Sequence, residues 1–198
     1  MPELVPAAVP AGRLCNLVQP TLAVDELILR PWRLSDAPAV VEAYRDPEIQ
    51  RWHVRSMAEP EARDWVRSWS DRWRAETGAG WAVTSRDVLV GRVGFRTIDL
   101  AEGIAELAYW TVPAARGRDI AARAVHAVSD WMFGSVGLHR IELRHSTANP
   151  ASCRIAEKAG FDYEATLRQQ ALHADGWHDM HLHTRLATEK TTSRRRDC

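Results

Sequence analysis

The sequence is poor in cysteine, has no long hydrophobic run and carries no net charge. Its three cysteines, among 198 residues, lie far apart and show no CxxC or Cys/His ligand spacing, which argues against a disulfide framework or a structural zinc site. No stretch approaches the roughly 18 apolar residues of a membrane span. Because 26 basic residues balance 26 acidic ones, no overall field attracts a membrane or nucleic acid. We therefore expect neither a membrane nor a specific nucleic acid as partner.

The N-terminal segment also lacks a secretory signal, because no basic stretch precedes an apolar run. We therefore expect the protein in the cytoplasm. The chain is somewhat longer than one typical domain of roughly 150 residues. We expect an N-terminal arm over residues 1–20, one domain over 21–186, and a polar, disordered tail over 187–198.

Hydrophobic periodicity inside the domain switches between strand and helix. Alternating apolar residues predict strands at 27–31, 81–84, 88–98, 104–112, 141–143, 161–167 and 180–184. Capping signals and apolar faces predict helices from Ser35 or Asp36 to Asp46, from about Ser56 through Trp73, at 121–133 and at 150–160. In strand 88–98, Leu89, Val93 and Phe95 are expected on one face, opposite Arg92 and Arg96. Helices interleaved with a mainly antiparallel sheet indicate an α/β (α+β) fold with a mixed sheet.

A basic strand-to-helix loop, Pro113-Ala-Ala-Arg-Gly-Arg-Asp-Ile, is the first segment with a chemical signal. Backbone N–H groups and the N-terminus of the following helix favour anionic oxygens. Arg116 and Arg118 can add charge-assisted hydrogen bonds to a phosphate. The other interpretation is an ordinary connection whose arginines are solvated.

The second segment with such a signal is Asn149-Pro-Ala-Ser-Cys-Arg-Ile-Ala-Glu-Lys-Ala-Gly-Phe. Asn149 is suited to the N-cap of a helix, Pro150 to its first position and Gly160 to its C-terminal end. Together with the basic loop, this segment resembles the GNAT (Gcn5-related) superfamily of N-acetyltransferases. Three further segments are similar to its RimJ/RimL-like branch, which acetylates the N-termini of ribosomal proteins: Leu29-Arg30-Pro31-Trp32, Ala108-Tyr109-Trp110 and Asp175-Gly176-Trp177-His178-Asp179.

The resemblance implies a GNAT fold, with a sheet splayed between its fourth and fifth strands and flanked by helices. It implies acetyl-CoA as co-substrate, with no metal, and direct attack of an amine on the thioester. Pantetheine is then expected against the backbone of Trp110, Thr111 and Val112. The pyrophosphate is expected on the loop and helix start, and three residues of the second segment complete the cofactor-binding set: Arg116, Gly117, Arg118, Asp119, Ile120 and Ala121, with Asn149, Ser152 and Lys158.

Transfer of the acetyl group requires a proton acceptor for the amine and a hydrogen-bond donor for the leaving thiolate. Glu106, in the strand before the loop, is the candidate base; the alternative is a solvated strand carboxylate. Ser152 is the candidate donor near the sulfur, or a residue that helps to cap its helix. Asn149 is expected both as an N-cap and as a cofactor contact.

Three positions depart from the family pattern. Asp119 stands where the loop usually has a second glycine, and a non-glycine residue in the left-handed region costs roughly 1–2 kcal/mol. Asp119 either repels the pyrophosphate or caps the following helix. Ala156 occupies the place of a tyrosine acid found in many relatives, so Ser152 or water must substitute. Ala171 occupies the place of a glutamate that some ribosomal-protein acetyltransferases carry.

The sequence contains nine tryptophans and a group of C-terminal histidines, and it does not decide their roles. Trp65, Trp69 and Trp73 recur every four residues on one helix face, and belong either to the core or to a wall beside the amine acceptor. Asp175-Gly176 predicts a hairpin turn before the last strand. His173 and Trp177, near this last hairpin, are further candidates for the acceptor pocket. His181 and His183 share a strand face but have no supporting carboxylate spacing, so we predict no metal.

We expect an acyl-CoA-dependent N-acyltransferase, with acetyl-CoA as donor. The acceptor is a primary amine of a protein N-terminus, an amino acid or a small metabolite. Two alternatives stay open. Asp119 would disfavour a donor carried on the phosphopantetheine of an acyl carrier protein less than it disfavours free CoA, and the departures at Asp119, Ala156 and Ala171 are compatible with a non-catalytic CoA-binding module. The oligomeric state is also open, a homodimer included.

Overall fold

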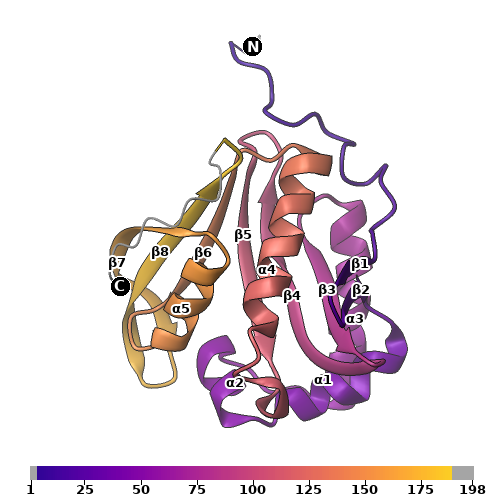
Figure 1. Ribbon diagram of the computed structural model, residues 1–198, viewed down its shortest axis with the longest axis vertical. Helices are drawn as coiled ribbons and strands as arrows, with labels where there is room; N and C mark the ends of the chain where they lie inside the picture. The colour runs from indigo at the N-terminus through magenta and orange to yellow at the C-terminus, as the bar shows by residue number, and fades with distance from the viewer. Residues whose placement is uncertain (1–3, 189–198) are drawn as a thin grey trace.

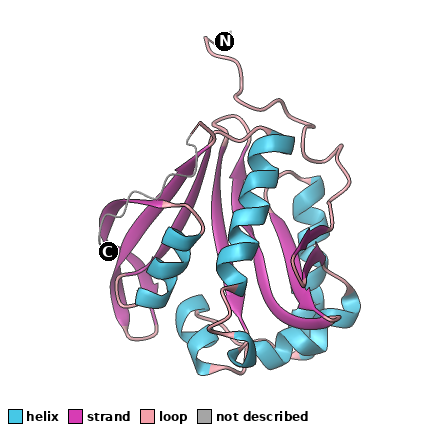
Figure 2. Cartoon of the chain, viewed as in Figure 1, coloured by secondary structure: helices cyan, strands magenta, loops and turns pink. Residues whose placement is uncertain are grey.

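An eight-stranded sheet forms the centre of the computed structural model, which describes residues 4–188 (Figures 1 and 2). The strand order is β1-β2-β3-β4-β5-β6-β8-β7. All neighbouring strands are antiparallel except β5 and β6, which are parallel. The strands are β1 (Leu22–Val24), β2 (Leu27–Pro31), β3 (Ala79–Ser85), β4 (Val88–Asp99), β5 (Ile104–Thr111), β6 (Arg140–Ser146), β7 (Asp162–His173) and β8 (Gly176–Leu186).

The helices are α1 (Ala37–Ala43), α2 (Pro47–His53), α3 (Glu59–Arg74), α4 (Ile120–Trp131) and α5 (Pro150–Lys158). Helix α4 covers β4 and β5, and α5 lies beside it over β6 (Figure 1). Helices α1 and α3 pack on each other around a cluster that includes Trp110. None of the helices within residues 4–188 is both long and apolar enough to cross a membrane.

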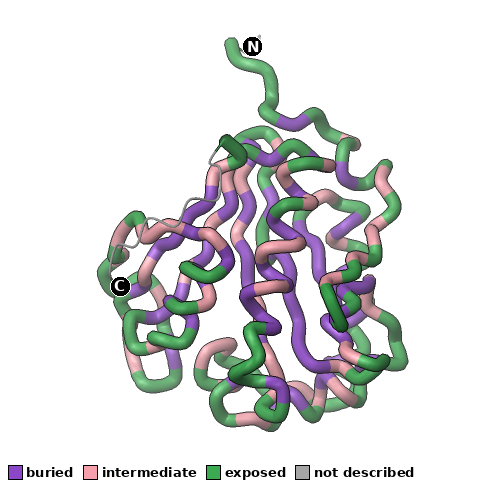
Figure 3. The backbone as a smooth tube through the Cα atoms, in the orientation of Figure 1, coloured by how far each residue is buried: buried purple, intermediate pink, exposed green. Residues whose placement is uncertain are grey.

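The splay expected between the fourth and fifth predicted strands is confirmed between β5 and β6. These strands pair only from Ile104 to Leu107, opposite Arg140–Leu143. Among residues 4–188, the rest of β5, up to Thr111, pairs with no strand on the β6 side. Figure 3 shows the buried central strands on either side of this divergence. The backbone edge of β5 is therefore available to a ligand.

Two elements were not predicted, β1 and α2. Asp46-Pro47 was expected to end a helix, yet Asp46 instead caps a new one: its carboxylate accepts from Ile49 N at 3.0 Å. Proline is well suited to the first position of a helix as well as to its end. The N-cap of α3 is Ala58 rather than Ser56, with Glu61 accepting from the Ala58 amide at 2.7 Å.

Leu89 lies on the opposite face from the one expected. The pairing of β3 with β4 shifts by one residue between Val83 and Thr84, and an inserted residue reverses which face the flanking side chains occupy. Leu89 therefore packs with the α1–α3 cluster, while Val93 and Phe95 join the main core as expected.

The described part of the predicted arm packs on the domain. Ala8 and Val9 donate to the carbonyls of Ala101 and Leu100 at 2.8 and 2.9 Å, and Leu14 is fully buried. Of the predicted tail, residues 189–198 lie outside the described residues.

Candidate active site

A cleft of about 930 Å³ opens where β5 and β6 part. Its walls come from α2, β5, the loop before α4, α5 and the β7–β8 hairpin. Most predicted site residues line it: Glu106, Trp110, Thr111, Arg116, Gly117, Asp119, Ile120, Ala121, Asn149, Ser152, Lys158, Trp69 and His173. Five others do not: Val112, Arg118, Trp65, Trp73 and Trp177.

The open edge of β5 presents the backbone of Tyr109 and Thr111 to the cleft. Their carbonyls face His53 Nε2 at 3.0 Å and Arg116 Nε at 3.3 Å. The Val112 amide instead donates to Val90 O of the β4 side at 3.0 Å. Since backbone groups alternate along a strand, Trp110 also faces β4. The backbone of Trp110 and Val112, which was expected to meet pantetheine, therefore faces β4, and the backbone of Tyr109 and Thr111 lies at the open edge.

The basic loop turns sharply into α4. Gly117 has φ +74°, and a Cβ added there would meet nothing within 4 Å. The first amides of α4 have no acceptor within the helix, so they are available to an anion at this edge of the cleft. Arg116 is not a free charge, because its guanidinium pairs with the carboxylate of Asp46, the N-cap of α2.

Asp119 has the left-handed conformation expected of it, with φ +53°, directly before α4. Its side chain makes no capping hydrogen bond, so the capping alternative is wrong. Lys158 at the end of α5 donates to Asp119 Oδ1 at 2.6 Å. The negative charge in the loop is therefore compensated by a residue that was predicted to contact the cofactor.

Tyr109 and Ser152 join the two halves of the splayed sheet through their hydroxyl groups, which are hydrogen-bonded. Ser152 lies in the first turn of α5, where its amide donates to the Asn149 side chain at 3.1 Å, so the predicted N-cap is confirmed. Burial raises the pKa of Tyr109, and its phenol stays protonated. This tyrosine comes from β5 and not from the helix that holds Ala156, so the spacing within that helix could not indicate it.

Glu106 is about one-fifth exposed on the face of β5 that carries Trp110. Arg96 Nε lies 3.5 Å from one carboxylate oxygen, and Arg144 lies 4.0 Å from the other. The carboxylate is therefore reachable from the cleft and held between two cations.

His53, the last residue of α2, was not identified from the sequence because α2 itself was not. Its Nε2 contacts the Tyr109 carbonyl on the open edge of β5. Burial, together with the charges of Arg92 and Arg96, lowers the pKa of His53 to about 3. His53 is therefore neutral at pH 7 and donates to the strand from Nε2.

The three tryptophans of α3 have different surroundings. Trp69 borders the cleft, Trp65 packs between Trp32 and Trp69, and Trp73 lies in the core against Trp81. Placing Trp73 in the acceptor pocket was wrong, because the α3 face extends from the cleft into the core.

The two candidates from the last hairpin, Trp177 and His173, also differ in their position relative to the cleft. Trp177 is 62% exposed and is not among the residues that line the cleft, so its role at the acceptor stays a prediction. His173 is buried at the cleft, where Nδ1 contacts Arg51 O at 3.1 Å and the ring packs on Trp52.

Comparison with known proteins places this cleft in a family. Residues 26–162 match the model of the acetyltransferase (GNAT) domain. The N-acetyltransferase YoaA of Bacillus subtilis (strain 168), whose role is uncharacterised, is 29% identical over 154 residues, 76% of this chain and 87% of YoaA. The ribosomal-protein-serine acetyltransferase of Escherichia coli (strain K12) is 28% identical over 104 residues, 52% of this chain and 58% of that protein.

Among solved structures, RimL, a ribosomal α-N-protein acetyltransferase in complex with coenzyme A, superposes with a TM-score of 0.79 at 17% identity. The match covers 84% of this chain and 98% of RimL. The protein belongs to the GNAT family and is an N-acetyltransferase, with relatives and structural neighbours in the RimJ/RimL branch.

Proposed function

We propose that the protein transfers the acetyl group of free acetyl-CoA to a primary amine by direct attack. The observation that supports this most is the open edge of β5 beside the unsatisfied amides at the start of α4. The carbonyls and amides of Tyr109 and Thr111 suit the amide groups of pantetheine, and the helix start suits a pyrophosphate. Coenzyme A is bound in the RimL structure, which has the same fold.

The proton of the attacking amine goes to Glu106. Its carboxylate lies in the cleft, on the face of β5 opposite Tyr109. A carboxylate at this position takes the proton directly or through one water. Arg96 and Arg144 hold it in place from either side.

The leaving thiolate is stabilised by the hydroxyl pair of Ser152 and Tyr109 at the start of α5. A thiol with a pKa near 8.5 needs only a hydrogen bond from a weak acid. We assign the hydrogen bond to the sulfur to Ser152, whose hydroxyl Tyr109 orients. This role extends the prediction for Ser152.

Free acetyl-CoA is favoured over a carrier-protein donor because the charge of Asp119 is compensated by Lys158. The repulsion that would have penalised a pyrophosphate is thereby reduced. The acceptor is the amine of a protein N-terminus, an amino acid or a small metabolite.

The test is an amine panel assayed by thiol release with acetyl-CoA. Glu106→Gln is expected to lower kcat by about 10²- to 10⁴-fold with little change in KM for acetyl-CoA. Glu102→Gln, on an exposed turn, is the matched control. An unchanged rate in Glu106→Gln would assign the base elsewhere, and preference for an acyl group on a carrier protein would overturn the donor.

A further inference from the structure

Apart from Nε of Arg144, whose guanidinium is paired with Glu142, three buried hydrogen-bond donors that line the cleft have no acceptor among the described residues. They are Nε of Arg92 on β4, Nε1 of Trp69 on α3 and Nε1 of Trp110 on β5. Buried donors in native proteins are nearly always paired, so each orphan requires an explanation. Three orphans of the same polarity in one cleft indicate a missing acceptor-rich group.

Arg92 is the strongest of the three because it carries a charge. It is 6% exposed and has no carboxylate within salt-bridge distance among residues 4–188. Its guanidinium lies 4.6 Å from the ring of Trp69 and 5.4 Å from that of Trp65, which holds it by cation–π contact. An unpaired buried charge is costly unless a ligand pairs it.

The surroundings of Arg92 are also positively charged, which makes a negatively charged ligand more favourable there. Burial, with the charges of Arg96 and Arg72, lowers the pKa of Arg92 to about 10, so that it remains a cation at pH 7. Arg55 also lines the cleft, and Glu106 is flanked by other arginines. The carboxylates of the cleft leave Arg92 unpaired.

The phosphates of coenzyme A are not suited to supply this charge. Arg92 lies opposite Trp110 in the β4–β5 register, and both side chains occupy the face covered by α1 and α3. The pyrophosphate loop leads into α4, which packs with Val93 and Leu107 on the other face. The charge must then come from the acceptor.

We propose that Arg92, Trp69 and Trp110 form an anion-binding subsite, and that the acceptor carries a carboxylate close to its amine. This inference rests on the proposed function. Arg92 is opposite Trp110, four residues from Glu106 along β5, or about 13 Å between Cα positions. With the two side chains in between, that spacing fits an acceptor about one amino-acid residue long, its amine toward Glu106 and its carboxylate toward Arg92.

The test compares matched acceptors, each amino acid against its carboxamide, in wild type and in Arg92→Met. Wild type is expected to prefer the acid by about 10- to 100-fold in kcat/KM, the scale of a hydrogen bond to a charged group. Arg92→Met should lose that preference, so that its kcat/KM values for the acid and for the carboxamide become equal. Arg67→Met, exposed on α3, is the control.

Arg92→Lys covers the case that Arg92→Met does not fold, because it keeps the charge and loses the forked geometry. It should retain part of the preference. Equal rates for acid and amide in wild type, or an unchanged preference in Arg92→Met, would overturn the proposal. If a phosphate-bearing amine has a higher kcat/KM than every amino acid, the proposal that the acceptor carries a carboxylate is wrong. If no amine is acetylated, the proposed function fails, and calorimetric binding of acid and amide to the two proteins still tests the subsite.

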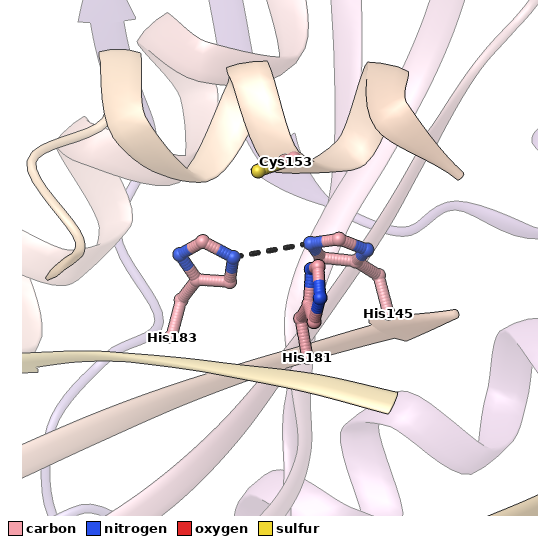
Figure 4. Close-up of side chains that lie close together, drawn as sticks. All are labelled: His145, Cys153, His181 and His183. Atoms are coloured by element: carbon pink, nitrogen blue, oxygen red, sulfur yellow. Dashed lines mark hydrogen bonds between the residues drawn. The ribbon is translucent and has the colours of Figure 1, made fainter. Parts of the chain in front are cut away.

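A separate observation concerns three histidines beneath α5: His145 on β6, with His181 and His183 on β8 (Figure 4). Their candidate ligand nitrogens and Cys153 Sγ all lie within 4.8 Å of one another. Adjacent strands bring the rings together, because His145 pairs with His181 in the β6–β8 register. The cysteine is already held in a disulfide, so it is not counted as a ligand.

The hydrogen bonds of His145 direct one lone pair inward. Its Nδ1 donates to the Ser146 carbonyl at 2.8 Å, so its Nε2 accepts from His183 Nε2 at 3.1 Å. A metal bound between the two rings would replace the proton that His183 Nε2 donates. A histidine held by a carbonyl on one nitrogen is the usual arrangement of a metal ligand. His181 Nδ1 is buried and has no hydrogen-bond partner among the described residues.

We infer that these three imidazoles bind a divalent transition metal of the zinc class, with water in the fourth position. Two ligands of a tetrahedral zinc at about 2.0–2.1 Å lie roughly 3.3 Å apart, close to the 3.1 Å between His145 and His183. Imidazole ligands without carboxylates favour zinc, copper or nickel over magnesium. Such a metal would fasten β6 to β8 directly beneath α5.

The test uses untagged full-length protein dialysed against Zn²⁺, and against Co²⁺ for its absorption spectrum. One metal per chain and a tetrahedral Co²⁺ spectrum are expected, and His183→Gln should lose both, as should the less buried His181→Gln. His139→Gln, on the exposed surface, is the control. Binding that survives both cluster variants, or that occurs only after a reductant frees Cys153, would overturn the three-histidine site.

Discussion

Lys158 at the end of α5 donates to Asp119 in the loop before α4, with Nζ 2.6 Å from Oδ1. Both side chains are more than half exposed, at 54% and 58%. The pair therefore contributes only about 0–1 kcal/mol to folding. The pair has a greater effect on the cleft, because Asp119 engages the Lys158 ammonium group, which would otherwise be available to a phosphate.

Asp119→Gly should tighten acetyl-CoA binding by about 1–2 kcal/mol, because it frees Lys158 for a charged hydrogen bond. Loss of the ion pair lowers the free energy of unfolding, whereas relief of the left-handed strain raises it, so Tm should change by only a few degrees. Titration calorimetry and thermal unfolding of the same samples measure both quantities.

Asp119→Asn is the matched control, since it removes the charge and keeps a side chain that tolerates the left-handed region. Equal gains in both variants would identify the freed Lys158 as the cause. Weaker binding by Asp119→Gly would show that Asp119 positions the loop and would contradict the prediction.

Tyr109→Phe and Ser152→Ala should each lower kcat, by about 10-fold or more, if the hydroxyl pair stabilises the leaving thiolate. Because the two groups form one hydrogen-bonded unit, their effects should not add in the double variant. Thiol release at saturating substrates measures all four proteins. Strictly additive losses would mean that the two hydroxyls act separately.

The free energy of unfolding should fall as the pH drops below 6.5. The pKa of His53 is about 3 in the folded protein, against about 6.5 when unfolded. Between these values the unfolded chain binds more protons, so the contribution of His53 is complete above pH 6.5 and decreases as the pH falls toward 3. The slope for one such group is at most about 1.4 kcal/mol per pH unit.

Urea denaturation at pH 7, 6, 5 and 4 tests this dependence. His53→Gln keeps an Nε2 donor for the Tyr109 carbonyl and removes the titration, so its stability should depend less steeply on pH. Part of the slope should remain, because burial also lowers the pKa of His145. Identical slopes in the two proteins would exclude His53 as a contributor.

Gly80→Ala should destabilise the protein by about 1–3 kcal/mol, the usual cost of overpacking. A Cβ at Gly80 would lie 2.5 Å from the ring of Trp69, which packs flat on the β3 backbone. Gly134→Ala is the control, since a Cβ there meets nothing within 4 Å. Urea denaturation measures both, and an equal effect would contradict the packing argument.

Local signals predicted much of the fold and part of the site. Asn149, Pro150 and Gly160 bound α5 as expected, and Asp175-Gly176 forms the last hairpin turn. Each of these features is decided by the backbone preferences of a few consecutive residues. Pro47 shows the limit of such signals, because the same residue can end one helix or begin the next.

The amino-acid sequence by itself determined the family, the basic loop, the caps of α5 and the candidate base Glu106. Only the tertiary structure decided that Tyr109 meets Ser152, that Lys158 compensates Asp119, and that Arg92 is buried without a partner. It also brought His145 to two histidines more than thirty residues further along the chain. These relationships depend on which strands and helices lie side by side, and that arrangement is not encoded within a short stretch of sequence.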